Sequence, residues 1–215
     1  MGDFEVRVIS NRSEPDLMIE MHKLRYRVFK QRLDWEVAVS GGMEIDIYDI
    51  EDPVYLGLIG PGERLFGAAR FLPTTGPNML ADTFPMLLHG QPMPRGETIW
   101  DCSRLCIDTE ASAAIAEGGL RRATHVLIAG IAAWGHARGI TKLVAATDLH
   151  VERILRRAGC RVERLGPPIV IGKVPSVGCS FEVSARAVAE TRAAGGITSG
   201  LVVHDGLAET PRKRA

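Results

Sequence analysis

The sequence predicts one α/β domain with a mixed, twisted β-sheet flanked by helices. At 215 residues, the chain is long enough for one domain with a full-sized core and short for two. Its 46% hydrophobic and 24% charged side chains are ordinary for a globular protein. Segments with strand-like and helix-like patterns follow one another in the order strand, helix, strands, helix, strand, helix, strands. This order is typical of an α/β domain with a mixed sheet.

The chain begins with a strand, a helix and a long loop. Phe4–Ile9 alternates apolar and polar side chains, as a strand with one solvated face does. Leu17–Phe29 has apolar residues near the helical period, which places Arg25 and Phe29 four apart on one side of a helix. Gln31–Asp49 has no sustained period, two adjacent glycines and many charges. We therefore expect a functional, mobile loop there.

A hairpin and a central strand follow. Val54–Ile59 and Arg64–Leu72 are apolar strands on either side of Gly60-Pro61-Gly62, which is a hairpin signal. The next stretch is rich in proline, and we expect only short helical turns over Met79–Leu88. Glu97–Ile107 then alternates as a central strand. Regular alternation puts Ile99, Asp101, Ser103 and Leu105 on one face and Trp100, Cys102, Arg104 and Cys106 on the other.

The second half supplies the remaining helices and strands. Ala111–Arg138 is an alanine-rich helical segment with a predicted break at Gly118-Gly119. Thr141–Thr147 is predicted as a buried strand and Leu149–Ala158 as a helix that a glycine ends. Two or three short strands then run to about Val183.

We assign residues 1–185 to the domain and 186–215 to a flexible C-terminal tail, because that end is rich in alanine, glycine and threonine. No apolar run approaches the ~18 residues that cross a bilayer. The first five residues lack the basic and apolar stretches of a signal peptide. The four cysteines form no C-x-x-C pair and accompany no histidine cluster, which favours reduced core thiols over a metal site. We expect a cytoplasmic protein without a metal or a membrane partner.

Charge is unevenly spread although the total is zero. Residues 1–60 carry 7 basic and 12 acidic side chains, a difference of −5, and residues 121–173 carry 10 basic and 3 acidic, a difference of +7. The basic segment indicates a docking surface for an anion or an acidic partner. Nucleic acid is disfavoured, because no nucleic-acid-binding motif accompanies the charge.

The most informative feature is an ordered run of charged and aromatic residues in the first half. Its members are Arg25, Phe29, Trp35, Asp46, Asp49, Arg70, Phe84, Asp101 and Arg104. Packing of a core does not require arginines and acids held between aromatic rings, whereas a site for a zwitterionic small molecule does. Taken alone, the acids of the loop are typical of a solvated face, and only their company of arginines and aromatic residues favours a site. Asp101 and Arg104 likewise fit either a buried structural pair or a general base in a cleft.

A second cluster lies on the helix near residue 150. His150, Arg153, Arg156 and Arg157 are its basic side chains. They fit a solvated helix face, or a docking patch for a phosphopantetheine carrier such as acyl carrier protein or coenzyme A. Other catalytic motifs, namely G-x-S-x-G, H-E-x-x-H and G-x-x-x-x-G-K-[ST], are missing from the sequence.

The ordered run resembles the signature of the acyl-homoserine lactone synthases, the LuxI-type autoinducer synthases of quorum sensing. The similarity covers about residues 4–165 and is strongest in 20–108, and residues 147–159 resemble the branch typical of rhizobial plasmids. The resemblance implies the GNAT-like acyltransferase fold, in agreement with the predicted order of elements. The Q/R-x-x-G-x-G/A loop of ordinary GNAT enzymes is missing, and Glu117-Gly118-Gly119-Leu120 does not replace it.

The resemblance also implies the reaction. An acyl group passes from acyl carrier protein or acyl-CoA to the amine of S-adenosylmethionine, and a lactone then forms with release of 5′-methylthioadenosine. S-adenosylmethionine is a substrate, so no cofactor is implied. The implied residues for its binding are Arg25, Phe29, Trp35, Asp46, Asp49, Arg70, Phe84, Ser103 and Arg104. Those assigned to catalysis are Asp101, Arg104, Asp46 and Asp49.

Two residues depart from the family pattern. Asp101 stands where the family usually has glutamate, so a proton would pass through a water. Ala145 stands where many members that prefer 3-oxo acyl chains have threonine. We therefore expect an unsubstituted acyl chain, or one recognised by another contact such as Thr147. The side chains expected to line the acyl pocket are Cys102, Val126, Leu127, Ala145, Thr147 and Val151.

Two other functions remain open at this point. One is a diverged GNAT N-acyltransferase that acylates another amine without forming a lactone. The other is a non-catalytic module that binds S-adenosylmethionine or an acyl carrier. Release of methylthioadenosine separates the synthase from the first, and turnover separates it from the second.

Overall fold

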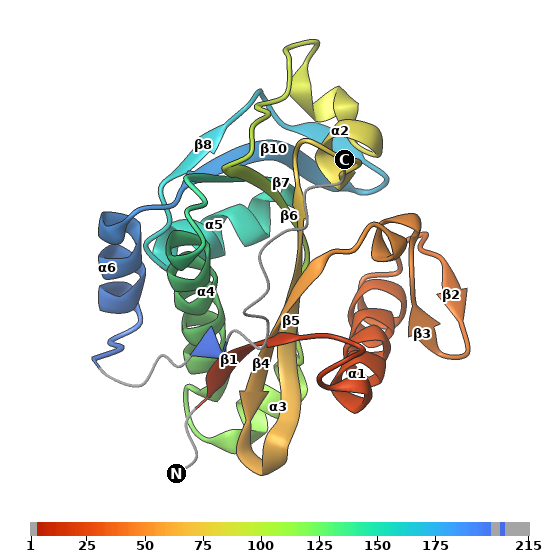
Figure 1. The fold of residues 1–215 in the computed structure, drawn as a ribbon. Helices are drawn as coiled ribbons and strands as arrows, with labels where there is room; N and C mark the ends of the chain where they lie inside the picture. Colours follow the sequence, from red (N-terminus) through yellow and green to blue (C-terminus); the bar gives the residue numbers. More distant parts are fainter. Residues whose placement is uncertain (1–3, 199–202, 205–215) are drawn as a thin grey trace.

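A mixed sheet forms the centre of the computed structural model, which describes residues 4–198 and 203–204 (Figure 1). Within these residues its strands are β1 Glu5–Ile9, β4 Val54–Gly60, β5 Arg64–Pro73, β6 Ile99–Ile107, β7 Lys142–Asp148, β8 Val162–Arg164, β9 Ile169–Ile171, β10 Val174–Glu182 and β11 Val203–His204. Their order is β11-β1-β4-β5-β6-β7-β10-β8, with β9 paired to β10. Most neighbours are antiparallel, but β6 and β7 are parallel, which confirms the predicted mixed sheet.

Helices cover both faces of this sheet. They are α1 Pro15–Arg25, α2 Met79–Asp82, α3 Thr109–Ile115, α4 Gly119–Ala137, α5 Leu149–Arg157 and α6 Ala185–Ala194. In Figure 1, α1 lies on one side of the central strands, and α4, α5 and α6 lie on the other. None of the described helices is both long enough and apolar enough to cross a membrane.

The core is divided by the sheet into two main clusters. On the α4 side, Leu127 and Trp134 of α4 belong to one buried cluster with Phe71 of β5 and Ala145 of β7. On the α1 side, Met21 belongs to a second cluster with residues of β4, β5 and β6. The central strands are therefore buried on both faces, which explains why β4 and β5 read as nearly continuous apolar runs.

The predicted break in the long helical segment is confirmed. Helix α3 ends at Ile115, Gly118 adopts a φ of 75°, and α4 begins at Gly119. A Cβ atom on Gly119 would lie 2.2 Å from the carbonyl oxygen of Ser112. Only glycine permits this close approach of the two helices.

The helix predicted over Leu17–Phe29 changes its hydrogen bonding partway. It is α-helical to Arg25 and continues as a π-helix over Tyr26–Arg32. Wide turns of this kind are frequent at functional sites, because they shift side chains out of the regular helical register. Arg25 is the last residue of the α-helical part, and Phe29 lies in the π-helical part. The two side chains therefore do not keep the spacing of a regular α-helix.

The loop predicted over Gln31–Asp49 contains regular elements. A short hairpin joins β2 Val39–Ser40 to β3 Met43–Glu44, and a 3-10 helix, η2, covers Ile47–Ile50. Further 3-10 turns occur at η3 Pro61–Glu63 and at η4 Pro85–Leu88, the latter within the predicted stretch of short helical turns. The hairpin was not predicted, since its strands have two residues each and carry no detectable period.

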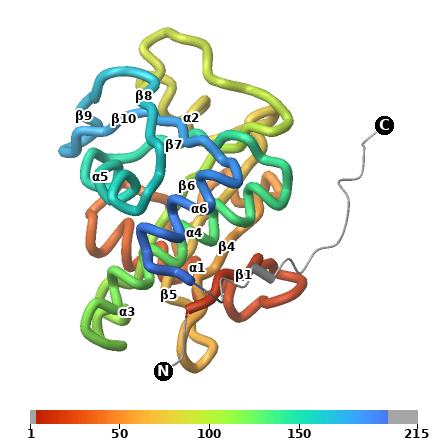
Figure 2. Tube along the Cα trace, turned by 90° about the vertical axis from the view of Figure 1, so that its left-hand side faces the viewer, coloured from red at the N-terminus to blue at the C-terminus, as the bar shows by residue number. Residues whose placement is uncertain are grey.

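The structure differs from the predicted tail over residues 186–215. Ala185–Ala194 form α6, which Ser184 caps by accepting from the backbone N–H of Ala187 at 3.2 Å. Figure 2 shows α6 packed against α4, and Ile197 beyond it is buried in the α4-side core. Alanine is the strongest helix former, so this composition favours a helix once one face is covered. The rest of the predicted tail, apart from 203–204 in β11, lies outside the described residues.

Candidate active site

The sharpest departure from a regular strand is at Arg104 in β6. Its φ is +54°, in the left-handed region that non-glycine residues rarely adopt. The pairing of β5 with β6 shifts register between Ala68 and Arg70, opposite this residue. This is a β-bulge, which re-aims the side chain that it carries. Arg104 consequently points to the α1 side of the sheet, where it lies over the ring of Phe29 at 5.4 Å.

The bulge makes part of the predicted face assignment of β6 wrong. Arg104 was expected on the face of Cys102, but it joins Ser103 on the α1 side. Beyond the bulge the alternation is inverted, so Cys106 belongs to the α1-side core and Leu105 packs against the α4-side core. The charged groups of β6 thus gather on one side of the sheet, and Cys102 lies on the other.

Three arginines and three acids form one closed ion cluster on the α1 side. The arginines are Arg25 at the end of α1, Arg70 in β5 and Arg104 in β6, and the acids are Glu44 in β3 and Asp46 and Asp49 around η2. Arg25 and Arg70 are fully buried. Charges buried this deeply require partners in good hydrogen-bonding geometry, and each of the six has them.

The contacts join segments that lie far apart in the sequence. Arg25 donates to both oxygens of Asp49, at 2.8 and 2.9 Å. Arg70 donates to Asp46 and Asp49, and its Nε donates to the hydroxyl of Ser103 at 3.1 Å. Arg104 lies 2.7 Å from Asp46. The cluster therefore ties α1, η2, β5 and β6 together, which gives the 34–51 segment a fixed place beside the sheet.

Asp46 and Asp49 also build the start of η2. The Asp46 side chain accepts from the N–H of Tyr48 at 2.9 Å, and the Asp49 side chain accepts from the N–H of Asp46 at 2.7 Å. This reciprocal pattern is a capping box, here made by two aspartates. The same two carboxylates therefore bind both the backbone of η2 and the guanidinium groups. The capping box fixes the positions of the carboxylates relative to η2.

Glu44 is the site residue that the sequence analysis missed. It is fully buried, and its carboxylate binds Arg25 Nε at 2.5 Å and Arg104 Nη2 at 2.9 Å. A charge count on the sequence does not find it, because the run already contains three acids, and only the structure shows that Asp101 lies apart from the arginines.

The charges of the cluster shift the pKa values of Asp49 and Tyr55. Burial alone raises the pKa of Asp49, but hydrogen bonds from Arg25 and the charge of Arg70 outweigh it and hold the pKa well below its usual range. Burial and the adjacent Asp49 raise the pKa of Tyr55, whose hydroxyl donates to that carboxylate at 2.5 Å. Asp49 therefore stays ionised, and Tyr55 stays protonated, through the neutral pH range.

Two of the three predicted aromatic residues form a wall beside the cluster. The rings of Phe29 and Trp35 stack with centroids 5.3 Å apart, and Phe29 is buried beneath the guanidinium of Arg104. Phe84 does not join this stack. It lies before η4 and packs against the cluster of Tyr48, Leu72 and Met79, next to the turn that follows α2.

Asp101 lies apart from the closed cluster and is fully buried in β6. Its Oδ1 accepts from the backbone N–H of Leu80 at 3.3 Å, whereas its Oδ2 has no partner in the described part of the chain. Burial raises the pKa of Asp101 to about 6, against the opposing effects of the Leu80 N–H, the charge of Arg70, the Ser103 hydroxyl and the Met79 N–H. Arg104 pairs with Glu44 and Asp46 instead, so among the described ion pairs Asp101 and Arg104 do not form one.

The predicted acyl-pocket residues lie on the opposite, α4 side of the sheet. Val126, Leu127 and Ala145 are buried in the α4-side core, and Cys102 and Val151 pack against it. Thr147 is two residues after Ala145 in β7 and therefore shares its face. The parallel pairing of β6 with β7 is recorded only up to Asp101 and Val144. Beyond these residues β6 and β7 no longer pair. The gap between them connects the sheet face that carries Asp101 with the face that carries Cys102.

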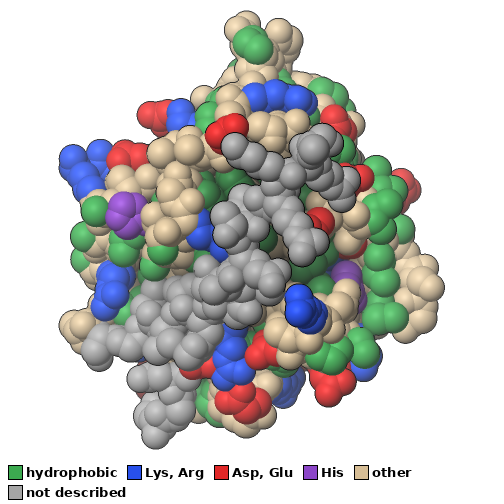
Figure 3. All heavy atoms as spheres, viewed as in Figure 1, with side chains coloured by type: hydrophobic (Ala, Val, Ile, Leu, Met, Phe, Trp, Pro, Cys, Tyr) green, Lys and Arg blue, Asp and Glu red, His purple; other side chains and the backbone are tan. Residues whose placement is uncertain are grey.

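The predicted basic patch on α5 divides into paired and unpaired side chains. Arg156 binds Glu152, which is buried and also binds Arg164. His150, Arg153 and Arg157 are exposed, and no partner is recorded for them among the described residues. On the face shown in Figure 3, side chains of both charges are intermixed, so the surplus of basic residues in 121–173 makes no continuous patch there.

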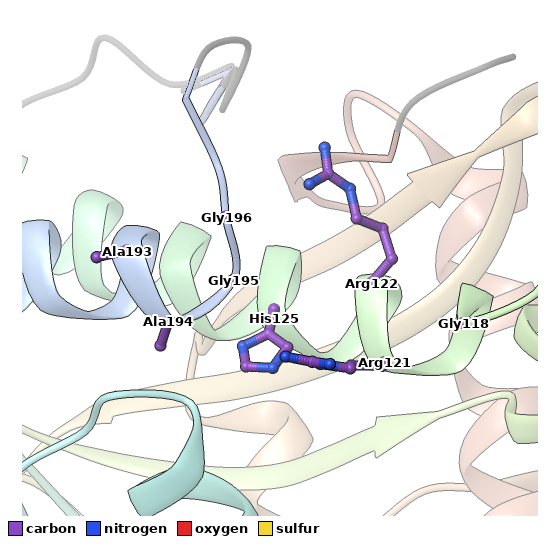
Figure 4. A pocket seen from close by; sticks show the side chains of 8 residues that line it. All are labelled: Gly118, Arg121, Arg122, His125, Ala193, Ala194, Gly195 and Gly196. Atoms are coloured by element: carbon purple, nitrogen blue, oxygen red, sulfur yellow. The ribbon is translucent and has the colours of Figure 1, made fainter.

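A cavity of about 390 Å³ lies between the start of α4 and the end of α6. Figure 4 shows its lining, with the Arg121 side chain beside the His125 ring and Arg122 directed away from it. Burial and the charge of Arg121 lower the pKa of His125. None of the predicted site residues lines this cavity, so it is separate from the ion cluster.

Comparison with known proteins gives a consistent result. A family model described as autoinducer synthase matches residues 9–190. A probable acyl-homoserine-lactone synthase of Sinorhizobium fredii is 40% identical over 167 residues, which cover 78% of this chain and 80% of that protein. An acyl-homoserine-lactone synthase of Rhizobium radiobacter is 42% identical over 158 residues, which cover 74% of each. Both relatives fit the resemblance to the rhizobial branch.

Solved structures agree with the sequence relatives. The acyl-homoserine lactone synthase LasI is similar with a TM-score of 0.77 at 34% identity, covering 95% of this chain and 98% of that chain. BjaI, a CoA-dependent acyl-homoserine lactone synthase solved with S-adenosylmethionine and isopentyl-CoA, is similar with a TM-score of 0.80 at 25% identity, covering 93% and 92%. The fold alone recurs in FeeM, an N-acyl amino acid synthase from uncultured soil microbes, with a TM-score of 0.51 at 16% identity, covering 85% and 93%. The predicted GNAT-like acyltransferase fold is confirmed.

Proposed function

The chain belongs to the autoinducer synthase family and is an acyl-homoserine-lactone synthase, and from this premise we propose how its residues perform the reaction. The observation that carries the proposal is the closed ion cluster beside the buried carboxylate of Asp101, whose Oδ2 accepts no hydrogen bond from the described residues. The cluster fixes charges on the α1 side of the sheet, and Asp101 faces the same side. The acyl-pocket residues lie across the sheet, where β6 and β7 separate.

The reaction has two bond-forming steps. First, the amine nitrogen of S-adenosylmethionine attacks the thioester carbon, and the carrier leaves as a thiol. Second, the carboxylate oxygen of the same molecule attacks its γ-carbon, the carbon–sulfur bond breaks, and methylthioadenosine leaves as a neutral thioether. The sulfonium is a good leaving group, so the protein mainly positions the carboxylate. We assign this positioning to the cluster and to the wall of Phe29 and Trp35.

The first step requires a base, because the amine of S-adenosylmethionine is protonated near neutral pH. Asp101 is the group that fits. With a pKa raised to about 6 it is ionised above that pH, and its Oδ2 is free to accept a proton directly or through a water. Arg104, Asp46 and Asp49 take the positioning role, because their charges are already satisfied within the cluster.

Position 145 allows a test of whether the protein prefers a 3-oxo group on the acyl donor. Ala145 offers no hydroxyl, so we expect no preference for a 3-oxo group on the donor. Ala145→Thr introduces a donor and is expected to raise the relative kcat/KM for 3-oxo donors about tenfold. Methylthioadenosine release is measured with 3-oxo and plain acyl donors of equal length. An unchanged ratio would show that position 145 does not contact the third carbon.

The exposed arginines of α5 provide a test of the carrier. We propose that Arg153 and Arg157, with His150, contact the acyl carrier, while Arg156 is held by Glu152. The double variant Arg153→Glu/Arg157→Glu is expected to raise the KM for an acyl carrier protein donor about tenfold, because it replaces attraction by repulsion. The KM for S-adenosylmethionine should not change.

The matched control is Arg12→Glu, which reverses an exposed arginine in the turn before α1. If the double variant and the control had the same KM for the donor, α5 would not be the docking surface. A donor of acyl-CoA measured in parallel tells whether the arginines serve a protein carrier or the phosphates of coenzyme A.

The function is tested by expression in a bacterium that makes no such signals, followed by mass spectrometry of the medium. We expect compounds that yield the homoserine-lactone fragment. Acylated products without this fragment would favour the runner-up, an N-acyltransferase for another amine. We place the reaction in the cytoplasm, since the four cysteines are unpaired thiols and acyl carriers belong to that compartment.

A further inference from the structure

One buried donor of the α4-side core has no acceptor. Trp134 of α4 is 1% exposed, and its indole Nε1 has no hydrogen-bond partner in the described part of the structure. Leaving a buried N–H unpaired is unfavourable, and native structures contain few such groups. A group of this kind needs a partner, and the residues that the structure describes supply none for Trp134.

Trp134 lies beside the predicted acyl pocket. Its ring centroid is 4.7 Å from that of Phe71 and 5.9 Å from that of Trp100. Phe71 is the cross-strand partner of Cys102, and Trp100 precedes Cys102 by two residues on the same face. Trp100 also pairs with Leu143, just before the point where β6 and β7 separate. Trp134 thus lies at the closed end of that separation, in one core cluster with Ala145.

The neighbouring donors in this wall are already used. The indole Nε1 of Trp100 donates to the carbonyl of Glu97 at 3.3 Å. The thiol of Cys179, which pairs with Ala145 across the sheet, donates to the carbonyl of Ala145 at 3.6 Å. Ala145 itself has only a methyl group. Trp134 therefore carries a buried donor without an acceptor among the described residues, in the same predicted pocket as the hydroxyl of Thr147.

We propose that Trp134 is a specificity-determining residue, and that the preferred acyl group carries an oxygen that accepts a hydrogen bond from its Nε1. The proposal rests on the proposed function, since it concerns the acyl donor of that reaction. This oxygen of the acyl chain lies beyond the third carbon, counted from the thioester. The residue expected beside the third carbon is Ala145, which has no donor. The substrate class is an acyl thioester with a keto or hydroxyl oxygen beyond the third carbon of its chain.

The test uses acyl-CoAs of equal chain length, each plain or with one keto or hydroxyl oxygen at the third, fifth, sixth or seventh carbon. Methylthioadenosine release gives kcat/KM for each donor. The wild-type protein should prefer one donor oxygenated at the fifth, sixth or seventh carbon about tenfold over the plain one, because that oxygen satisfies the buried N–H. A preference for the third-carbon donor would contradict the proposal. Trp134→Phe keeps an aromatic ring and removes the N–H, so the ratio of kcat/KM for the oxygenated donor to that for the plain donor should fall to about one.

Trp100→Phe is the matched control, since it removes an indole N–H that already has an acceptor in the same wall. It should leave the preference unchanged. If the wild-type protein and Trp134→Phe ranked the donors alike, the N–H would be satisfied within the protein, for example over the Trp100 ring, and the proposal would be wrong. If no donor released methylthioadenosine from the wild-type protein, the proposed function would fall together with this inference.

Discussion

Asp101→Asn is expected to lower kcat about 10²–10⁴-fold, the usual contribution of a general base. The amide keeps the shape of the side chain and an oxygen for the N–H of Leu80, but it cannot take a proton from the amine. The wild-type kcat/KM should fall tenfold per pH unit below about pH 6, because the protonated carboxyl is inactive as a base. Above that pH the carboxylate is available and the rate should level.

The same change is expected to stabilise the protein at pH 8. The folded pKa of Asp101 is raised from 3.8 to about 6, so the ionised form is disfavoured in the folded state. The resulting loss in the free energy of unfolding is fully present above about pH 6 and absent below the ordinary carboxyl pKa of 3.8. Asparagine removes it, so the free energy of unfolding should rise by up to about 3 kcal/mol at pH 8 and by less as the pH falls. Urea denaturation at pH 8 and pH 4 measures the difference.

Asp101→Glu is the matched variant, because it restores the acid that is usual in the family. It should keep most of the activity. If Asp101→Asn turned over at the wild-type rate with an unchanged pH profile, another group would be the base. Loss of activity together with loss of stability at pH 8 would point to a structural role for Asp101 instead.

Glu44→Gln is expected to have the second large effect. The carboxylate is fully buried between Arg25 and Arg104, so its neutralisation leaves two guanidinium groups short of negative charge. Breaking a buried ion pair by removing one partner costs about 3–5 kcal/mol. We expect a loss of this order in the free energy of unfolding, and a KM for S-adenosylmethionine at least tenfold higher, since Arg104 loses its bidentate partner.

Glu51→Gln is the control, since it neutralises an exposed acid just after η2, in the same part of the chain. Urea denaturation and methylthioadenosine release are measured for both variants. Equal stability and equal KM for the two would mean that Glu44 is not part of the cluster in solution.

Much of the ion cluster was predictable from the sequence, because its arginines and aspartates stand in the order and spacing of the signature that the run resembles. Arg25, Arg70, Arg104, Asp46 and Asp49 were singled out, and the structure brings them into one cluster. The alternating and helical periods also gave the order of the main strands and helices. These signals are local, and each reflects one buried face of one element.

The remaining features depend on contacts between distant segments. The bulge at Arg104 leaves no mark in the sequence, since no glycine or proline accompanies it, and regular alternation put this residue on the wrong face. Glu44 became identifiable only in the structure, which pairs it with Arg25 and Arg104 and places Asp101 apart from the cluster. Helix α6 depends on packing against α4, which composition alone does not reveal.

The most direct test is to incubate the purified protein with S-adenosylmethionine and a panel of acyl-CoAs and acyl carrier proteins. Methylthioadenosine and acyl-homoserine lactone are quantified together. We expect methylthioadenosine and the lactone in equal amounts, because every lactone closure expels one thioether. An acylated product formed without methylthioadenosine would contradict this expectation and identify the protein as an acyltransferase that forms no lactone.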